Sequence, residues 1–167
     1  QAQGEAHKAD AGCGKIGLVG SALSDYPAID DLCSSIVGSL SVSSLRADSL
    51  SKTLIDRLAK SGHKTIALAP EAGSERLRKV INKGVTEEDV LRAADLIFGA
   101  GIPNLKLYFI IGLPTETQDD MEEIVRLAEK LHEVQLRHAR PAGRIGRITL
   151  SVNSFVPKPF TPFQWEP

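Results

Sequence analysis

Short runs of apolar residues alternate along the chain with longer stretches in which apolar residues recur every three or four positions. Short continuous runs are typical of parallel strands buried on both faces, and the longer pattern is typical of the helices that cover them. Because helical stretches separate the runs and no hairpin signal occurs, we expect right-handed crossovers and a parallel sheet. The pattern predicts strands at residues 15–19, 40–45, 65–69, 105–111 and 147–152.

Polar residues and glycines predict where the helices begin and end. Ser24 to Pro27 predict a cap and an early proline for a first helix, which carries Ile29, Leu32, Ile36 and Val37. A second helix through Leu54, Ile55 and Leu58 should stop at Ser61-Gly62.

The two later crossovers are longer. Gly73-Ser74 should start a helix that stops near Lys83-Gly84, and Thr86 with Asp89 resembles a capping box for another that ends at residues 99–101. Thr117 should cap a long helix, which gives way to a basic loop at residues 137–146. Its expected core stripe is Met121, Ile124, Val125, Ala128, Leu131 and Val134.

Composition makes the chain an ordinary globular segment. Its 167 residues are 42% hydrophobic and 25% charged, with a net charge of -1, so nothing in the bulk charge favours nucleic acid. The first dozen residues are too polar for a secretory signal, and no apolar run could cross a bilayer, so we expect a cytoplasmic protein. Cys13 and Cys33 lack CxxC spacing and are expected to be reduced and packed.

Polar residues and glycines follow every predicted strand. Because the carboxyl ends of parallel strands meet at one edge, these residues should surround one opening, in an open doubly wound sheet or in an arc of a barrel. They are Gly20-Ser21, Ser44 with Arg46, Glu71 with Gly73-Ser74, Gly112 to Glu116, and Asn153 to Pro159. We therefore predict a small-ligand pocket there.

Each of these residues also has a purely structural interpretation. Arg46 would pair with Asp48 at the surface, or its guanidinium would hold a carboxylate or ribose oxygens. Glu71 would complement the dipole of the next helix, and Gly112 would make a tight turn or let a flat ligand approach the backbone. The four histidines have no metal-ligand spacing, and the chain carries no Ser-His-Asp arrangement, Walker loop or GxGxxG.

Four stretches resemble motifs of the radical S-adenosylmethionine (SAM) superfamily, in the order in which that family carries them. They are SVSSLRADSL, IALAPEAGSERLRKVINKG, YFIIGLPTET and SFVPKPFTPFQW. The resemblance covers about residues 15 to 167 and implies a partial (βα) barrel of the TIM type. This chain would supply strands two to six, with residues 1–14 as the end of a preceding helix or an added extension.

The resemblance also implies site residues and cofactors. Ser44 and Arg46 would contact the ribose and carboxylate of SAM, Ile111 and Gly112 the adenine, and the backbone at Phe155 and Val156 the adenine edge. Glu71 would face SAM or substrate. The intact enzyme would cleave SAM with an electron from a 4Fe-4S cluster, and the 5'-deoxyadenosyl radical would remove a substrate hydrogen. Flavodoxin or ferredoxin would donate the electron.

The chain departs from the family pattern in two places. The C-x3-C-x2-C motif that holds the cluster is absent, so the segment alone should be inert. The Gly-Gly-Glu turn that binds the methionine amino group falls at Gly20-Ser21-Ala22, which lacks the acid. The closing stretch is closest to an uncharacterised subgroup often joined to a cobalamin-binding domain, which adds cobalamin to the cofactors to test.

Two other functions stay open at this point. One is a non-catalytic binding module with a decayed radical SAM fold, which predicts no cysteine triad in the parent protein. The other is a barrel enzyme acting on a phosphorylated metabolite, against which the proline-rich exit at Pro157 to Pro162 argues. If the first strand of the barrel is missing, an open sheet edge should favour self-association.

Overall fold

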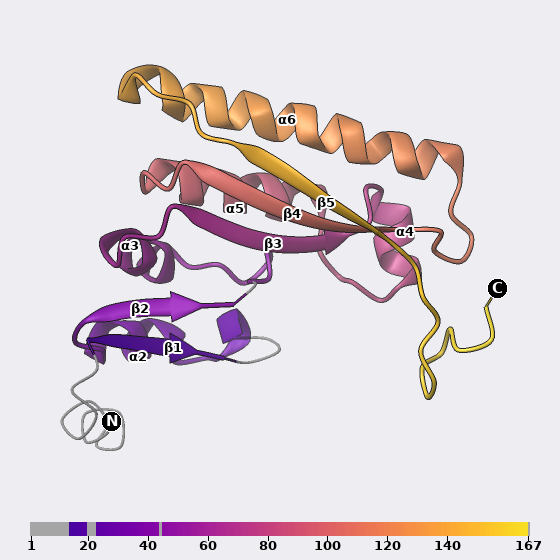
Figure 1. Ribbon diagram of the computed structural model, residues 1–167, viewed down its shortest axis with the longest axis horizontal. Coiled ribbons are helices and arrows are strands. Elements are labelled where there is room, and N and C mark those ends of the chain that lie inside the picture. The colour runs from indigo at the N-terminus through magenta and orange to yellow at the C-terminus, as the bar shows by residue number, and fades with distance from the viewer. Residues whose placement is uncertain (1–13, 20–22, 44, 167) are drawn as a thin grey trace.

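Five parallel strands lie across the molecule in the order in which they occur along the chain (Figure 1). The computed structural model describes residues 14–19, 23–43 and 45–166. The strands are β1 (Lys15–Leu18), β2 (Ser39–Val42), β3 (Thr65–Glu71), β4 (Asn104–Ile111) and β5 (Ile148–Ser154). All five predicted strands are present, with ends that differ by a few residues.

The strand order decides between the two architectures left open by the sequence. β1 pairs with β2, and β3, β4 and β5 pair in that order, every pair being parallel. A parallel bridge between Leu45 and Leu68 connects the segment after β2 to β3. A doubly wound sheet reverses its strand order near the middle, whereas a barrel arc does not. The fold is therefore a partial (βα) barrel, as predicted.

Helices connect consecutive strands, and most begin where the sequence predicts. The helical elements are η1 (Leu23–Asp25), α2 (Ile29–Ser35), α3 (Lys52–Lys60), α4 (Glu75–Val80), α5 (Glu87–Gly99) and α6 (Gln118–Ala142). Thr86 and Thr117 both form complete capping boxes, which confirms those two starts. No helix in the described part of the chain is long and apolar enough to span a membrane.

Three helix predictions were wrong. The cap position of α2 is Ala28, which makes no side-chain bond, because Ser24 belongs to η1 and is buried there. Helix α4 ends at Val80, before the expected Lys83-Gly84. Helix α6 continues through the predicted loop to Ala142 and contains Pro141. A proline is tolerated so close to a helix end because little helix follows it to be disrupted.

The expected stripe of α6 was also partly wrong. Met121 and Val125 are exposed, at 36% and 57%, whereas Leu127 is fully buried and packs beside Leu131. The buried set is Ile124, Leu127, Leu131 and Val134, which recurs every three or four residues and so follows one face of the helix.

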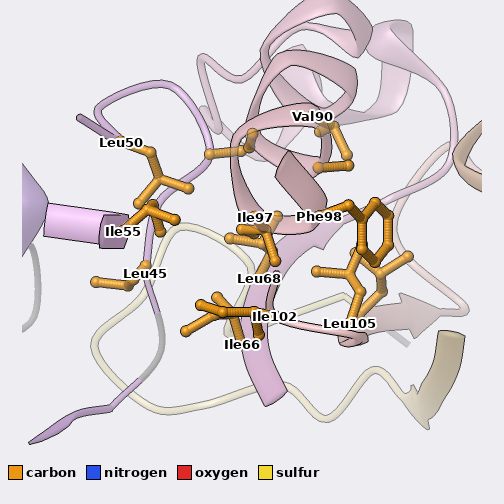
Figure 2. Packing of buried hydrophobic residues seen from close by; sticks show 14 of the residues in the cluster. Leu45, Leu50, Ile55, Ile66, Leu68, Val90, Ile97, Phe98, Ile102 and Leu105 are labelled. Carbon is orange, nitrogen blue, oxygen red and sulfur yellow. The ribbon is translucent and has the colours of Figure 1, made fainter. Parts of the chain in front are cut away.

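The main core lies between one face of the sheet and the helices (Figure 2). Alternate strand residues such as Ile66, Leu68 and Leu105 point into it and meet Ile97 and Phe98 of α5. Burying each such side chain stabilises the fold by about 1.5–3 kcal/mol. This outer layer fixes which residues the strands present on their other face.

The opposite, inner face of β3–β5 carries small and polar side chains. In a parallel pair, residues in register share a face, so Ala67 lies beside Lys106, Tyr108 beside Ser151, and Ile110 beside Asn153. The interior of a complete barrel is filled mainly by bulky branched residues. Here small and hydrophilic side chains take many of those positions, which leaves room for a ligand.

Candidate functional site

A hollow of about 650 Å³ lies where β3, β4 and β5 end. Its lining combines apolar and polar residues: Ala69, Glu71, Tyr108, Phe109, Ile110, Asn153, Ser154, Phe155, Val156, Lys158, Thr161 and Phe163. Three of the predicted site residues, Glu71, Phe155 and Val156, therefore meet at one opening. A mostly apolar concave site with a few polar groups is the usual form of a small-molecule pocket.

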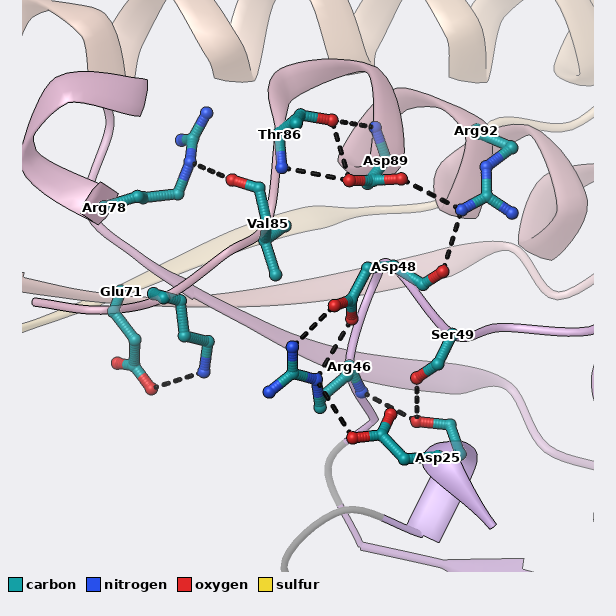
Figure 3. A network of polar contacts seen from close by, with 12 residues as sticks. Asp25, Arg46, Asp48, Ser49, Glu71, Arg78, Val85, Thr86, Asp89 and Arg92 are labelled. Carbon is teal, nitrogen blue, oxygen red and sulfur yellow. Dashed lines mark hydrogen bonds and ion pairs between the residues drawn. The ribbon is translucent and has the colours of Figure 1, made fainter. Parts of the chain in front are cut away.

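Glu71 reaches this hollow through an irregularity in β3. The register between β3 and β4 shifts between Leu68 and Glu71, and the backbone of Glu71 has φ 69°. A non-glycine residue in the left-handed region costs free energy and occurs often at functional sites. The Glu71 carboxylate lies 3.4 Å from the Lys83 ammonium, and both are about a quarter exposed (Figure 3). Glu71 is thus held by a cation at the mouth.

Arg46 is engaged by acids of this chain. Its Nε and Nη2 donate to the two carboxylate oxygens of Asp48, at 3.1 and 2.5 Å, and Asp25 lies 3.5 Å away (Figure 3). These contacts raise the pKa of Arg46, the hydrogen bond to Asp48 most strongly. The predicted Asp48 pairing is confirmed. The ligand role stays a prediction, since a guanidinium has five N–H donors and this fork uses two.

The Ser24 hydroxyl braces the segment around Arg46. It accepts hydrogen bonds from the Ser49 hydroxyl at 2.8 Å and from the Arg46 backbone N–H at 3.4 Å. The predicted site residues Gly20, Ser21 and Ser44 lie outside the described residues. Of the site residues predicted after the first two strands, Arg46 is the one whose surroundings the structure describes.

Gly112 combines a turn with open space. Its φ is 78°, and a Cβ there would meet nothing within 4 Å. Its N–H donates to the Glu116 carboxylate at 2.5 Å, which closes the turn. Both interpretations of this glycine are therefore compatible with the structure: the positive φ favours glycine, and the bare backbone leaves room for a flat group.

Ile111 lies differently from expectation. Its side chain packs against the main core on the helix side, whereas Ile110 lines the hollow. Strand alternation explains this, because adjacent residues point to opposite faces. An adenine contact by Ile111 could come only from its backbone, and Ile110 is the better candidate for a side-chain contact.

The chain after β5 closes one side of the hollow. The Phe155 N–H donates to the Ile111 carbonyl at 2.7 Å, and the Phe155 ring stands edge to face with Phe163 at 6.2 Å. Val156 is 68% exposed. Phe155 is thus fixed beside the Gly112 turn, which places the two predicted adenine loops next to each other.

Sequence reasoning missed a buried carboxylate that joins two loops of this rim. Asp120 accepts hydrogen bonds from the Ser74 hydroxyl, the Arg76 guanidinium, and both the hydroxyl and the backbone N–H of Thr117. Hydrogen bonds hold the pKa of Asp120 well below its usual range, and the bond from Arg76 contributes more than those from Ser74 and Thr117. The sequence predicted Thr117 as the cap of α6 but not its pairing with Asp120, and no local pattern signals a partner 44 residues away.

Two neighbours complete this junction. Gly73 leaves no room for a side chain, because a Cβ there would lie 2.4 Å from the Ile124 nitrogen. Arg78 is 1% exposed, and its guanidinium donates to the carbonyls of Ala72, Gly73 and Val85. Burial lowers the pKa of Arg78. The E-x-G-S segment is therefore shaped by packing and backbone hydrogen bonds.

The described residues do not fit the ligand set of a 4Fe-4S cluster. They contain no group of three or more His, Cys, Asp or Glu side chains that could hold a metal. Cys33 is fully buried, and burial raises the pKa of its thiol, as expected for a packed cysteine. Cys13 lies outside the described residues. His63 and His138 contact the Leu40 carbonyl and the Asp95 carboxylate, each at 2.8 Å.

One family model matches most of this chain, and two sequence relatives match parts of it or nearly all of it. The model of the radical SAM superfamily matches residues 2–128. An uncharacterized protein of Methanocaldococcus jannaschii is 40% identical over 155 residues, covering 91% of this chain and 32% of that protein. A tRNA-2-methylthio-N(6)-dimethylallyladenosine synthase of Thermotoga petrophila is 31% identical over 87 residues, covering 51% of this chain and 19% of that enzyme.

A solved structure shares the fold. Coproporphyrinogen III oxidase of Escherichia coli, described as a radical SAM enzyme, aligns with a TM-score of 0.60 and 14% identity. The alignment covers 94% of this chain and 36% of that one. The chain thus spans about a third or less of the length of each of these three proteins.

Proposed function

Because this chain belongs to the radical SAM superfamily, we propose that it forms the SAM- and substrate-binding part of an enzyme that starts radical chemistry on a small molecule. The observation that carries the proposal is the hollow at the carboxyl ends of β3–β5, with Glu71 at its mouth and the bare Gly112 turn beside it. The residues that would hold the cluster lie elsewhere in the parent protein.

In such enzymes a 4Fe-4S cluster supplies an electron that splits SAM into methionine and a 5'-deoxyadenosyl radical, and the radical abstracts a substrate hydrogen. The residues of this chain would bind SAM and the substrate, orient them and enclose them. The Gly112 backbone and the Phe155–Val156 segment would sandwich the adenine. Arg46 would offer its remaining donors to the ribose or carboxylate, with Asp48 keeping the guanidinium in place.

Glu71 would act at the boundary between SAM and substrate. Its carboxylate is an acceptor for an ammonium or hydroxyl group, and the ion pair with Lys83 orients it. This acid would compensate for the one missing at Gly20-Ser21-Ala22. The assignment of residues 1–167 to strands two to six of the barrel is part of the same proposal.

The proposal also implies partners. A reduced flavodoxin or ferredoxin would deliver the electron, and the enzyme would work in the cytoplasm. Cobalamin would require the further domain found in the related subgroup.

Anaerobic reconstitution of the full-length parent protein with iron and sulfide tests the proposal. We expect 5'-deoxyadenosine and methionine to form in equal amounts when SAM and dithionite are both present, and neither product when dithionite is left out. A parent sequence without a C-x3-C-x2-C upstream of this segment, together with no product, would favour the non-catalytic binding module.

A further inference from the structure

Lys106 stands on the inner face of the barrel arc with no acidic partner among the described residues. It is the third residue of β4, with Ala67 and Thr149 beside it in register. Its ammonium lies 4.7 Å from the centre of the Tyr108 ring, the next inner residue of the same strand. The side chain therefore runs along the strand toward the carboxyl end, so its charge lies over the middle of the sheet.

The hollow beside Lys106 has a neutral or positive lining. Lys106 lines a second hollow, of about 570 Å³, together with Thr65, Asn104, Thr149 and Arg147, and none of the residues that line it is acidic. Tyr108 lines the upper hollow described above. Lys106 thus sits between the proposed reaction site and the amino ends of the strands.

Hydroxyl groups stand next to this charge. Thr149 is paired with Lys106, and Ser151 with Tyr108, so both share the inner face. Within the described part of the chain, neither hydroxyl makes a hydrogen bond to another protein group. A partly buried ammonium without a carboxylate is costly unless something compensates its charge. Two neighbouring donors and one cation form a suitable group for an oxyanion.

We propose that Lys106, with Thr149 and Ser151, binds a carboxylate or phosphate group of the substrate inside the barrel. This rests on the proposed function, because it assumes that the substrate enters the hollow at the carboxyl ends. Gly112 lies four positions after Tyr108, about 13 Å along the strand. The substrate would therefore be an elongated anionic molecule, with its reactive end at the rim and its anionic end at Lys106.

The test is calorimetric titration of the full-length protein with inorganic phosphate and, separately, with succinate, at an ionic strength held constant with potassium chloride. We expect one of the two anions to bind, and K106Q to weaken its binding tenfold or more, as for the loss of a hydrogen bond to a charged group. The anion that binds distinguishes a phosphate from a carboxylate. K106R and Y108F should bind nearly as the wild type does.

K52Q is the matched control. The Lys52 side chain is 77% exposed and pairs with Asp56. Both residues belong to helix α3, not to a strand of the inner face. We expect K52Q to bind the anion as the wild type does. Binding of neither anion by the wild type, or equal weakening by K106Q and K52Q, would overturn the proposal.

Protection from acetylation provides a second measurement that needs no variant. The binding anion should slow acetylation of Lys106 several-fold relative to Lys52, as measured by peptide mass spectrometry. Equal rates with and without the anion would contradict the assignment. SAM binding, measured on the same samples, keeps the two hypotheses apart: loss of SAM binding bears on the proposed function, and loss of anion binding alone bears on Lys106.

Discussion

Arg76 and Asp120 form an ion pair that joins the first turn of α4 to the start of α6. Asp120 is 4% exposed, and Arg76, which is half exposed, also donates to the Thr115 carbonyl at 2.7 Å. The Arg76 guanidinium therefore connects the start of α4 with the turn that follows Gly112. Ser74, which also donates to Asp120, brings the E-x-G-S segment into the same junction. The geometry of the rim depends on this contact as much as on the strands themselves.

D120N should destabilise the protein by about 2 kcal/mol, because it removes a hydrogen-bonded charge from a buried position. Urea denaturation measures the change. D119N is the control, since Asp119 is its exposed neighbour on the same first turn, and it should stay within about 0.5 kcal/mol of wild type. Equal effects of the two substitutions would show that Asp120 acts only through the helix dipole.

The same carboxylate predicts an acid limb in the stability profile. Folding lowers the pKa of Asp120, whereas an aspartate in the unfolded chain has a pKa of about 3.9. The contribution of Asp120 is therefore fully present above that value and is lost as the pH falls below it. Urea unfolding between neutral and acidic pH should show a steeper loss for wild type than for D120N. Parallel curves would contradict this.

G73A should be strongly destabilising, whereas G84A should be tolerated. A Cβ on Gly73 would collide with the Ile124 backbone and lie 2.8 Å from the Asp120 carbonyl, but one on Gly84 meets nothing within 4 Å. We expect a loss of about 1–3 kcal/mol or more for G73A, as for an overpacked core. Thermal melting compares the two, and a G73A protein as stable as G84A would mean that α6 can shift away from the loop.

R78K should lower stability although it keeps the positive charge. The guanidinium serves three backbone carbonyls at once, and an ammonium on a flexible stem cannot reproduce that fork. We expect a loss of about 2 kcal/mol from carbonyls left without a donor. R126K, which alters an exposed pairing with Glu122 and Glu123, should be nearly neutral. Chemical denaturation distinguishes the two outcomes.

R46K tests the SAM-binding rim directly. Lysine keeps the charge but cannot pair with Asp48 through a fork and still present further donors in a fixed plane. We expect SAM affinity of the reconstituted parent protein to fall about tenfold, which corresponds to about 1.4 kcal/mol. R126K is the control, because Arg126 pairs with Glu122 and Glu123 on the exposed face of α6. Unchanged affinity in R46K would leave Arg46 a purely structural residue.

The sequence predicted the strands, the capping box of α5, the cap of α6 and the family, because each depends on neighbouring residues or short motifs. The errors arose where distant contacts decide the outcome. Val125 is apolar and correctly spaced, yet the sheet lies on the Leu127 side of α6. Ser24 would suit a cap, but its hydroxyl is used by Ser49 and Arg46.

The sequence also predicted part of the candidate site. Strand ends and glycines located the rim, and Glu71 does reach the hollow. The Arg76–Asp120 pair has no local signature, since it depends on how two segments 44 residues apart meet. The burial of Arg78 depends on how the chain on either side of α4 folds back onto its guanidinium. The inner-face position of Lys106 follows from strand alternation only once the register with β3 and β5 is known.

The bridge between Leu45 and Leu68 has a mechanical consequence. In the described residues, the backbone between the β1–β2 pair and the three-stranded sheet is connected by this bridge and by the hydrogen bond from the Leu45 N–H to the Ala67 carbonyl. The seam between the two sheets is therefore held together mainly by the packing of side chains such as Leu45, Leu50 and Leu54. Arg46, next to the seam, is where a small pivot of the first two strands would widen or narrow the mouth.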